Sequence, residues 1–108
     1  MFGVVTIGDR EIEMAANATT AIRYGQVFHG EDLLVYFTKG FKTTSESIYV
    51  AQKLGYIMAR AAEKADMNKL SEDGFIDWLE DFPPMAFVDS AEEILNAYMD
   101  QTEGTATP

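Results

Sequence analysis

Apolar and polar residues alternate over the first fifteen residues of the chain. The apolar positions on one side of this alternation are Val5, Ile7, Ile12 and Met14. A period of two residues is typical of strands with one buried face, and Gly8-Asp9 between two such runs is a hairpin-turn signal. The pattern predicts a β-hairpin at about residues 2–15, with strands near 2–7 and 11–15. Because a lone hairpin is marginal in water, we expect one face to pack on helices.

Two short helical segments are expected next, at 20–28 and 31–38. The residues that offer an N-cap for the first are Asn17, Thr19 and Thr20. Its apolar candidates are Ile22, Val27 and Phe28, with Tyr24 beside them. Gly30 and Gly40 interrupt the pattern and are expected to end the two segments.

The strongest helical signal covers residues 44–65. Thr43 and Glu46 have the spacing of a capping box. The apolar stripe with helical spacing consists of Ile48, Ala51, Leu54, Ile57 or Met58, Ala61 and Ala65. Gly55 inside a helix costs up to about 1 kcal/mol relative to alanine, so it indicates a close crossing with another element.

Two further helices are expected near the end of the chain. Ser71 can start the first, and Pro83-Pro84 ends it. Its apolar side consists of Phe75, Trp78, Leu79 and Phe82. Asp89, with Glu92 at capping-box distance, is expected to cap the last helix. Its buried residues are expected to be Ile94 or Leu95, then Tyr98 and Met99.

These elements predict an α+β fold that is mostly α-helical, in which the hairpin is followed by four to five helices. No internal repeat or linker divides the sequence, so residues 1–101 are expected to form a single domain. Residues 102–108 are polar and small, and are expected to form a flexible C-terminal tail.

Composition narrows the range of functions. The 108 residues are 47% hydrophobic and carry a net charge of −10, which is globular composition with a surface that repels phosphates and anionic lipids. We therefore expect neither nucleic acid nor a membrane as a partner. With no cysteine, thiolate chemistry and cysteine-based zinc sites are excluded. No signal peptide or membrane span is recognisable, so a cytoplasmic location is expected.

No catalytic, cofactor or metal site is expected. His29 is the only histidine, and no Gly-x-Ser-x-Gly motif accompanies it; it is expected to be a helix-terminal or surface residue. The acids occur mostly as adjacent pairs, which point about 100° apart on a helix and so do not face one another. Residues 66–74 resemble a calcium loop only briefly, because the glycine position is Ser71 and the last ligand position is Asp77.

Aromatic residues cluster in two places, around Pro83-Pro84 and near residues 36–41. Most are expected in the core, but a helical hairpin at Pro83-Pro84 could present one or two of them to a partner's apolar helix. Six methionines favour such an adaptable surface. The predicted protein-binding residues are Trp78, Phe82, Phe87, Met85, Tyr36 and Phe37.

Several short segments occur in a familiar order after the hairpin. They are Thr20-Ala21-Ile22-Arg23-Tyr24, Phe28, Gly30-Glu31-Asp32-Leu33-Leu34, Leu54-Gly55-Tyr56-Ile57-Met58-Ala59, Phe75-Ile76-Asp77-Trp78-Leu79-Glu80 and an acidic helix at 89–100. This order resembles the tail assembly chaperones of long-tailed, siphovirus-type phages and prophages of Gram-positive bacteria. The likeness covers about residues 10–100, and its motifs are short and permissive. The matching positions in the first two helices are Ile22, Arg23, Tyr24, Phe28, Gly30, Asp32 and Leu33.

The resemblance implies a non-catalytic chaperone. Such proteins bind the tape measure protein and keep it soluble until tail tube subunits assemble around it, and they are missing from the mature virion. The implied partners are the tape measure protein and the major tail tube protein, and self-association stays open. The resemblance also implies that Arg23 pairs with an acid and that Tyr24 and Phe28 pack. His29 departs from the family's usual Phe-Gly, which leaves the end of the first helix open.

Two other classes of function remain. The net charge of −10 suits an acidic DNA mimic, or another phage-encoded inhibitor or adaptor protein, although many acids lie at predicted helix starts instead of along one face. A small enzyme with paired carboxylates would need a cleft that holds two facing acids.

Overall fold

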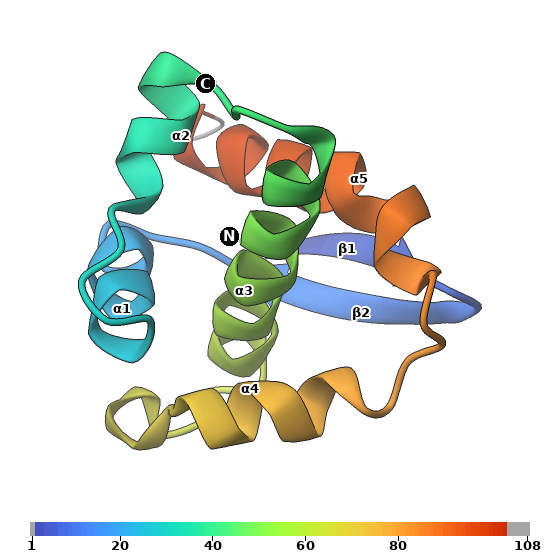
Figure 1. The fold of residues 1–108 in the computed structure, drawn as a ribbon. Coiled ribbons are helices and arrows are strands. Elements are labelled where there is room, and N and C mark those ends of the chain that lie inside the picture. Colours follow the sequence, from blue (N-terminus) through green and yellow to red (C-terminus); the bar gives the residue numbers. More distant parts are fainter. Residues whose placement is uncertain (1, 104–108) are drawn as a thin grey trace.

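The computed structural model describes residues 2–103 of the chain (Figure 1). A two-stranded antiparallel hairpin is followed by five α-helices and one short 3-10 helix, which confirms the predicted α+β, mostly helical fold class. The elements are β1 Phe2–Ile7, β2 Arg10–Ala15, α1 Thr20–Val27, α2 Leu33–Lys39, α3 Thr44–Ala62, η1 Met67–Lys69, α4 Glu72–Leu79 and α5 Ala86–Glu103.

The hairpin buries the face that the alternation predicted. Val5 lies opposite Ile12, and the alternating positions Val5, Ile7 and Met14 are fully buried. The turn contains only Gly8 and Asp9, so β2 begins at Arg10, one residue earlier than expected. Gly8 adopts a φ of 65°, a left-handed conformation that glycine takes without a Cβ clash.

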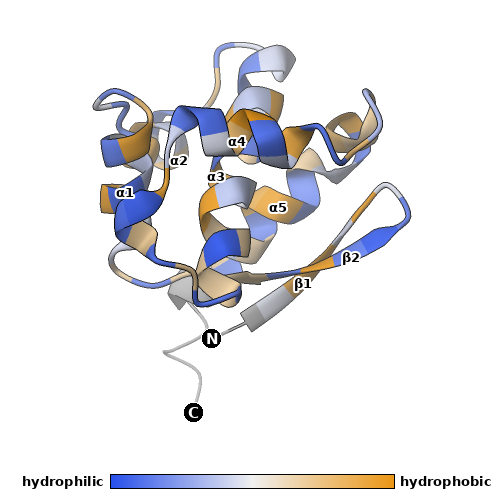
Figure 2. Cartoon of the chain, turned by 90° about the horizontal axis from the view of Figure 1, so that it is seen from below, coloured by the Kyte–Doolittle hydropathy of each residue, from blue (hydrophilic) through white to orange (hydrophobic). Residues whose placement is uncertain are grey.

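Helix α3 is the centre of the molecule. It packs with α5 against one face of the hairpin, while α1 and α2 lie on one side of it and α4 crosses near its C-terminal end (Figures 1 and 2). A Cβ at Gly55 would lie 3.4–3.5 Å from Trp78, Ile94 and Met14, which belong to α4, α5 and β2. The close crossing predicted at Gly55 is therefore confirmed.

The ends of α3 differ in part from the prediction. Thr43 accepts a hydrogen bond from the Glu46 N–H (3.0 Å), as expected, but the Glu46 carboxylate accepts from the N–H of Lys42 (2.7 Å) instead of Thr43. The helix ends at Ala62 and not at residue 65. Lys64 has a φ of 58°, and this left-handed conformation breaks the helical path.

The connection between α1 and α2 contains two left-handed residues. His29 and Gly30 have φ values of 56° and 76°, so the inserted histidine adopts the turn conformation together with the glycine. The next helix is then capped by Asp32, whose carboxylate accepts the N–H of Leu34 (3.0 Å). At the start of α1, Asn17 accepts the N–H of Thr19, and Thr19 itself makes no side-chain cap bond.

Helix α5 begins earlier than predicted. It starts at Ala86, with only Met85 between it and the prolines, so Asp89 lies inside the first turn and is not its cap. Proline fits the positions just before and at the start of a helix because its φ is already helical. Of the predicted tail 102–108, residues 102–103 continue α5, and residues 104–108 lie outside the described part.

One further contact joins α5 to the hairpin. The backbone N–H of Thr6 points to the outer edge of β1 and donates to the Glu93 carboxylate at 3.0 Å. Among the helices described here, none combines the length and the apolar composition that crossing a bilayer requires.

Candidate protein-binding surface

The aromatic residues near the prolines are buried. Trp78, Phe82 and Phe87 are at most 9% exposed, and their ring centroids lie 5.1–5.7 Å apart. Tyr56 and Phe75 extend the cluster, and we call these five residues the aromatic core.

The hairpin covers the Phe82 end of this cluster. Its turn reaches the α4–α5 connection, where Pro83 lies 3.6 Å from the position of a Cβ on Gly8. The Arg10 guanidinium lies 4.9 Å from the centroid of the Phe82 ring. Trp78, Phe82 and Phe87, which the sequence predicted to bind a partner, therefore stabilise the fold and are covered. Met85, in the same connection, is 65% exposed.

The other predicted aromatic residues lie at the surface around α2. The Tyr36 and Phe41 rings stack at a centroid distance of 5.4 Å with an interplanar angle of 11°. Phe37 packs on Tyr98 of α5 at 5.1 Å, and both Tyr36 and Phe37 are half-buried. This region, where α2 leads into α3, is the candidate functional site.

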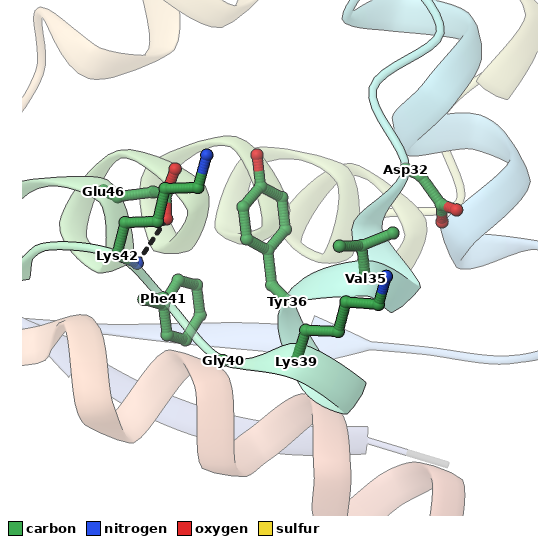
Figure 3. Close-up of a pocket in the computed structure, with 8 residues that line it drawn as sticks. All are labelled: Asp32, Val35, Tyr36, Lys39, Gly40, Phe41, Lys42 and Glu46. Carbon is green, nitrogen blue, oxygen red and sulfur yellow. Dashed lines mark hydrogen bonds between the residues drawn. The ribbon is translucent and has the colours of Figure 1, made fainter.

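Two hollows adjoin Phe41. The first, of about 350 Å³, lies between α2 and the start of α3 and is lined by Val35, Tyr36 and Phe41 (Figure 3). The second, of about 320 Å³, lies between α3 and α5 and is lined by Phe41, Ile48, Val88 and Leu95. Phe41 is the residue that the two linings share. We call Val35, Tyr36, Phe41, Ile48, Val88 and Leu95 the α3 track.

A third hollow, of about 280 Å³, opens on the other side of Tyr36. Its floor is a hydrogen-bond network around Glu31, which accepts from the Tyr24 hydroxyl (2.6 Å), the Tyr36 hydroxyl (3.2 Å) and the Lys53 ammonium (2.9 Å). Tyr49, 59% exposed, stands at its rim. The network joins α1, α2 and α3 and fixes the Tyr36 ring.

The network also shifts the protonation of its members. Burial of Glu31 favours the neutral acid, but the hydrogen bonds from Tyr24 and Lys53 outweigh it and hold the pKa below its ordinary value of 4.5. Burial and the hydrogen bond to Glu31 raise the pKa of the Tyr24 hydroxyl well above its usual range. Glu31 is therefore a charged acceptor at neutral pH, with donors on three helices.

The acidic and the basic groups around the α3 track differ in the contacts that they make. The carboxylates of Asp32 and Glu46 each accept a backbone N–H and so hold the helix starts. Within the described residues, no ion pair involves the ammonium group of Lys39 or Lys42. Figure 3 shows Tyr36 standing between these two lysines. The first hollow thus has free cationic groups beside stacked aromatic rings.

Most positions of the phage-chaperone pattern are structural. Tyr24 and Phe28 pack as expected, with centroids 5.2 Å apart, and Leu33 is 1% exposed. Ile22 is 61% exposed, because it lies on the outer side of α1. Arg23 donates to Asn68 (2.9 Å) and Gln26 (3.4 Å), so the expected pairing with an acid is wrong. Gly30 and Asp32 form the turn and cap described above.

The remaining polar residues that were weighed as candidates for chemistry make local contacts. His29 is a surface residue at the helix end, as predicted, and its Nε2 lies 2.6 Å from Glu72. Among residues 2–103, no group of three or more His, Asp or Glu side chains is placed to hold a metal ion. Every buried side-chain nitrogen or oxygen in the described part of the chain has a hydrogen-bond partner.

Sequence reasoning missed the second half of the α3 track. Ile48, Val88 and Leu95 have ordinary helical spacing, so nothing in the pattern separates them from core residues. A usable signal was Lys39-Gly40-Phe41-Lys42, an aromatic residue between two lysines in a chain of net charge −10. The comparisons with known proteins find no match, whether to a protein-family model, to a curated protein or to a solved structure.

Proposed function

We propose that this chain is a phage tail assembly chaperone that binds the tape measure protein and keeps it soluble until the tail tube assembles. The α3 track is the observation that carries this proposal, because it is a hollowed apolar surface that the fold leaves uncovered. The protein would act in the cytoplasm of the bacterial host and would be absent from the mature virion.

The shape of the α3 track favours a helical protein segment over a small ligand. Its two hollows, of about 350 and 320 Å³, lie at the lower end of the size range of small-molecule pockets. Both hollows are open and partly apolar, and they lie beside α2, α3 and α5, where apolar side chains of an amphipathic helix could enter them. A long helical client with an apolar face aggregates unless that face is covered, so such a surface supports a chaperone role.

The test is co-expression of this chain with the tape measure protein of the same phage or prophage. A soluble complex is expected with the wild type and with Ile22→Glu, whose side chain is exposed on α1 outside the track. Val35→Glu and Val88→Glu place a carboxylate in each hollow and should abolish the complex while the domain stays folded. A tape measure protein that stays insoluble, or a complex that none of the three variants changes, would contradict the proposal.

The other candidate partners need one added component. Co-expression that also includes the major tail tube protein shows whether a tail tube subunit joins the complex, and the mass of the complex shows whether it contains a second copy of the chain. The variants Val35→Glu and Val88→Glu then show whether either additional partner depends on the same surface. The composition and mass of the complex measure both directly.

A second candidate function, an acidic DNA mimic, is favoured by the charge of one region. Between residues 66 and 93 the chain has nine acidic residues and one basic residue. Glu72 and Asp73, however, lie in the first turn of α4 and Asp89 in the first turn of α5, where the helix dipole accounts for them without a DNA-like row of charges along one face. The mimic therefore ranks second. Competition with DNA for a host DNA-binding protein is its test, and an inactive Asp73→Asn/Asp77→Asn variant would support it.

A further inference from the structure

We infer that the hollow between α3 and α5, taken by itself, binds a basic amphipathic helix, with an apolar side chain in the hollow and a lysine or arginine of the same helix on Glu92. We call it the α3–α5 hollow. The inference rests on the proposed function, since it states which segments of a helical client this part of the surface accepts. It follows from the lining of the hollow and from the distribution of charge along the chain.

The α3–α5 hollow is mostly apolar and lies where α5 passes beside the start of α3 (Figure 1). Its apolar lining consists of Phe41, Ile48, Val88, Ala91 and Leu95. Val88 and Leu95 are seven residues apart, so they lie on one face of α5. Val88 is 46% exposed, and Ile48 and Leu95 are half-buried. An apolar side chain that enters the hollow therefore removes uncovered apolar surface from water.

The charge beside the α3–α5 hollow has one sign. Glu92 is the one charged residue in its lining, and it is exposed. Within the described residues its carboxylate has no ion pair and no hydrogen bond. Asp89, also exposed, lies in the preceding turn of α5. The hollow between α2 and α3 differs, because two acids and two lysines line it and neither sign is favoured.

The whole chain has the same asymmetry. Lys69 is its last basic residue, and the ten acidic residues that follow equal the net charge of −10. Residues 1–69, in contrast, contain as many acids as bases. The negative field of the protein therefore comes from the part of the chain that forms α4 and α5. Such a field attracts a cationic segment and repels an anionic one.

Charge and apolar contact have different roles at this site. Charges at the rim of an interface contribute mainly to partner choice and association rate, while the apolar centre supplies most of the affinity. On a helix, residues three or four positions apart are neighbours. A leucine-type side chain in the α3–α5 hollow and a base one turn away can therefore contact Val88 and Glu92 at the same time.

The test uses three peptides of about 18 residues, since shorter isolated helices are marginal in water. All three have the same leucine face, and the polar face is formed by lysine, glutamine or glutamate. The lysine peptide should bind about tenfold more tightly than the glutamine peptide at low salt, and the glutamate peptide should not bind. The difference should shrink at 1 M salt, where the Debye length is about 3 Å. Fluorescence anisotropy of labelled peptides measures the affinities.

A single carboxylate tests the position of the base. Glu92→Gln should weaken the lysine peptide about three- to fivefold and leave the glutamine peptide unchanged. Glu80→Gln is the matched control, because it removes the same charge at an exposed position after α4, which crosses the other end of the 28 Å-long α3 at about one helix length. The control should keep the wild-type affinity. Equal losses with both variants would mean that only net charge attracts the peptide, and would overturn the inference.

The place of binding is read from amide resonances. The lysine peptide should shift those of residues 44–48 and 88–95, and shifts confined to other elements would overturn the inference. If the tape measure protein binds but the three peptides bind equally well, the selection for basic helices is wrong while the proposed function stands. If neither the peptides nor the tape measure protein binds, the proposed function fails as well.

Discussion

Each of the two aromatic clusters of this molecule flanks a helix break, but one cluster is buried and the other lies at the surface. Trp78, Phe82 and Phe87 flank a helix-breaking Pro83-Pro84, and Tyr36 and Phe41 flank a helix-breaking Gly40. The first cluster is buried, because Arg10 of the hairpin covers Phe82 while Gly55 and Tyr56 of α3 pack against Trp78. The second stays at the surface beside two hollows. An aromatic cluster at a helix break is thus core or exposed surface according to which other elements reach it.

The largest effect is expected in the aromatic core. Trp78→Ala should lower the free energy of unfolding by about 3–5 kcal/mol, because it removes a buried indole and leaves a cavity. Urea denaturation followed by circular dichroism measures the loss. Trp78→Phe should cost clearly less, since it refills most of that space. An equal, small loss for both variants would mean that the cluster is not a packed core.

The next effect concerns the network beneath the surface cluster. Glu31→Gln should lower the free energy of unfolding by about 1–2 kcal/mol at pH 7, because charge-assisted hydrogen bonds from Tyr24 and Lys53 are weakened. The pKa of Glu31 is depressed in the folded state, so its contribution is present above about pH 4.5 and is lost as the pH falls through the folded value.

The difference between wild type and Glu31→Gln should therefore shrink in acid. Denaturation curves at pH 7, 5 and 3 test this, with Glu13→Gln at an exposed position of β2 as the control. A difference that is constant with pH would show that the charge of Glu31 contributes nothing to stability.

A smaller effect measures how closely α3 is packed on its core side. Gly55→Ala should raise the free energy of unfolding by about 0.5–1 kcal/mol, because alanine favours the helix and its Cβ finds ordinary contact distances of 3.4–3.5 Å. Gly55→Val adds two methyl groups at the same crossing and should destabilise the protein. The melting temperatures of both variants measure how much space the crossing leaves. A destabilised Gly55→Ala variant would mean that the crossing has no room for a Cβ.

The smallest effect on stability belongs to the surface cluster. Val35→Ser should change the free energy of unfolding by less than about 0.5 kcal/mol, because the side chain is 40% exposed. Partner binding should nevertheless weaken, since an apolar wall of the first hollow is lost. Thermal melting combined with a pull-down of the tape measure protein separates the two readouts. A strongly destabilised variant would place Val35 in the core and remove the contrast between the clusters.

Local patterns predicted the fold well. Period-two spacing located the hairpin, and helical spacing with caps located the helices, because both signals depend on residues close in sequence. The errors at the ends of α3 and α5 also have local causes. Lys64 adopts a left-handed conformation without being glycine, and the prolines start α5 at Ala86 before the stronger-looking cap at Asp89.

The candidate surface was less predictable, because exposure depends on contacts between distant segments. The sequence singled out Tyr36 but gave equal weight to Trp78, which packs against Gly55 and Tyr56 of α3. Val88 joins the track only because α5 passes beside the start of α3, forty residues earlier in the chain. Patterns in a single sequence give no signal for this contact between α5 and α3.

The contact between Glu93 and Thr6 bears on how this fold avoids pairing edge to edge with other chains. A two-stranded sheet has two open edges, and an unpaired edge is a template for strands of other chains. Here a carboxylate from α5 occupies an outward amide of β1, and Glu11 and Glu13 place charge along β2. The sheet edges are therefore poor partners for β-pairing, so a client of the proposed kind would be met by the helices.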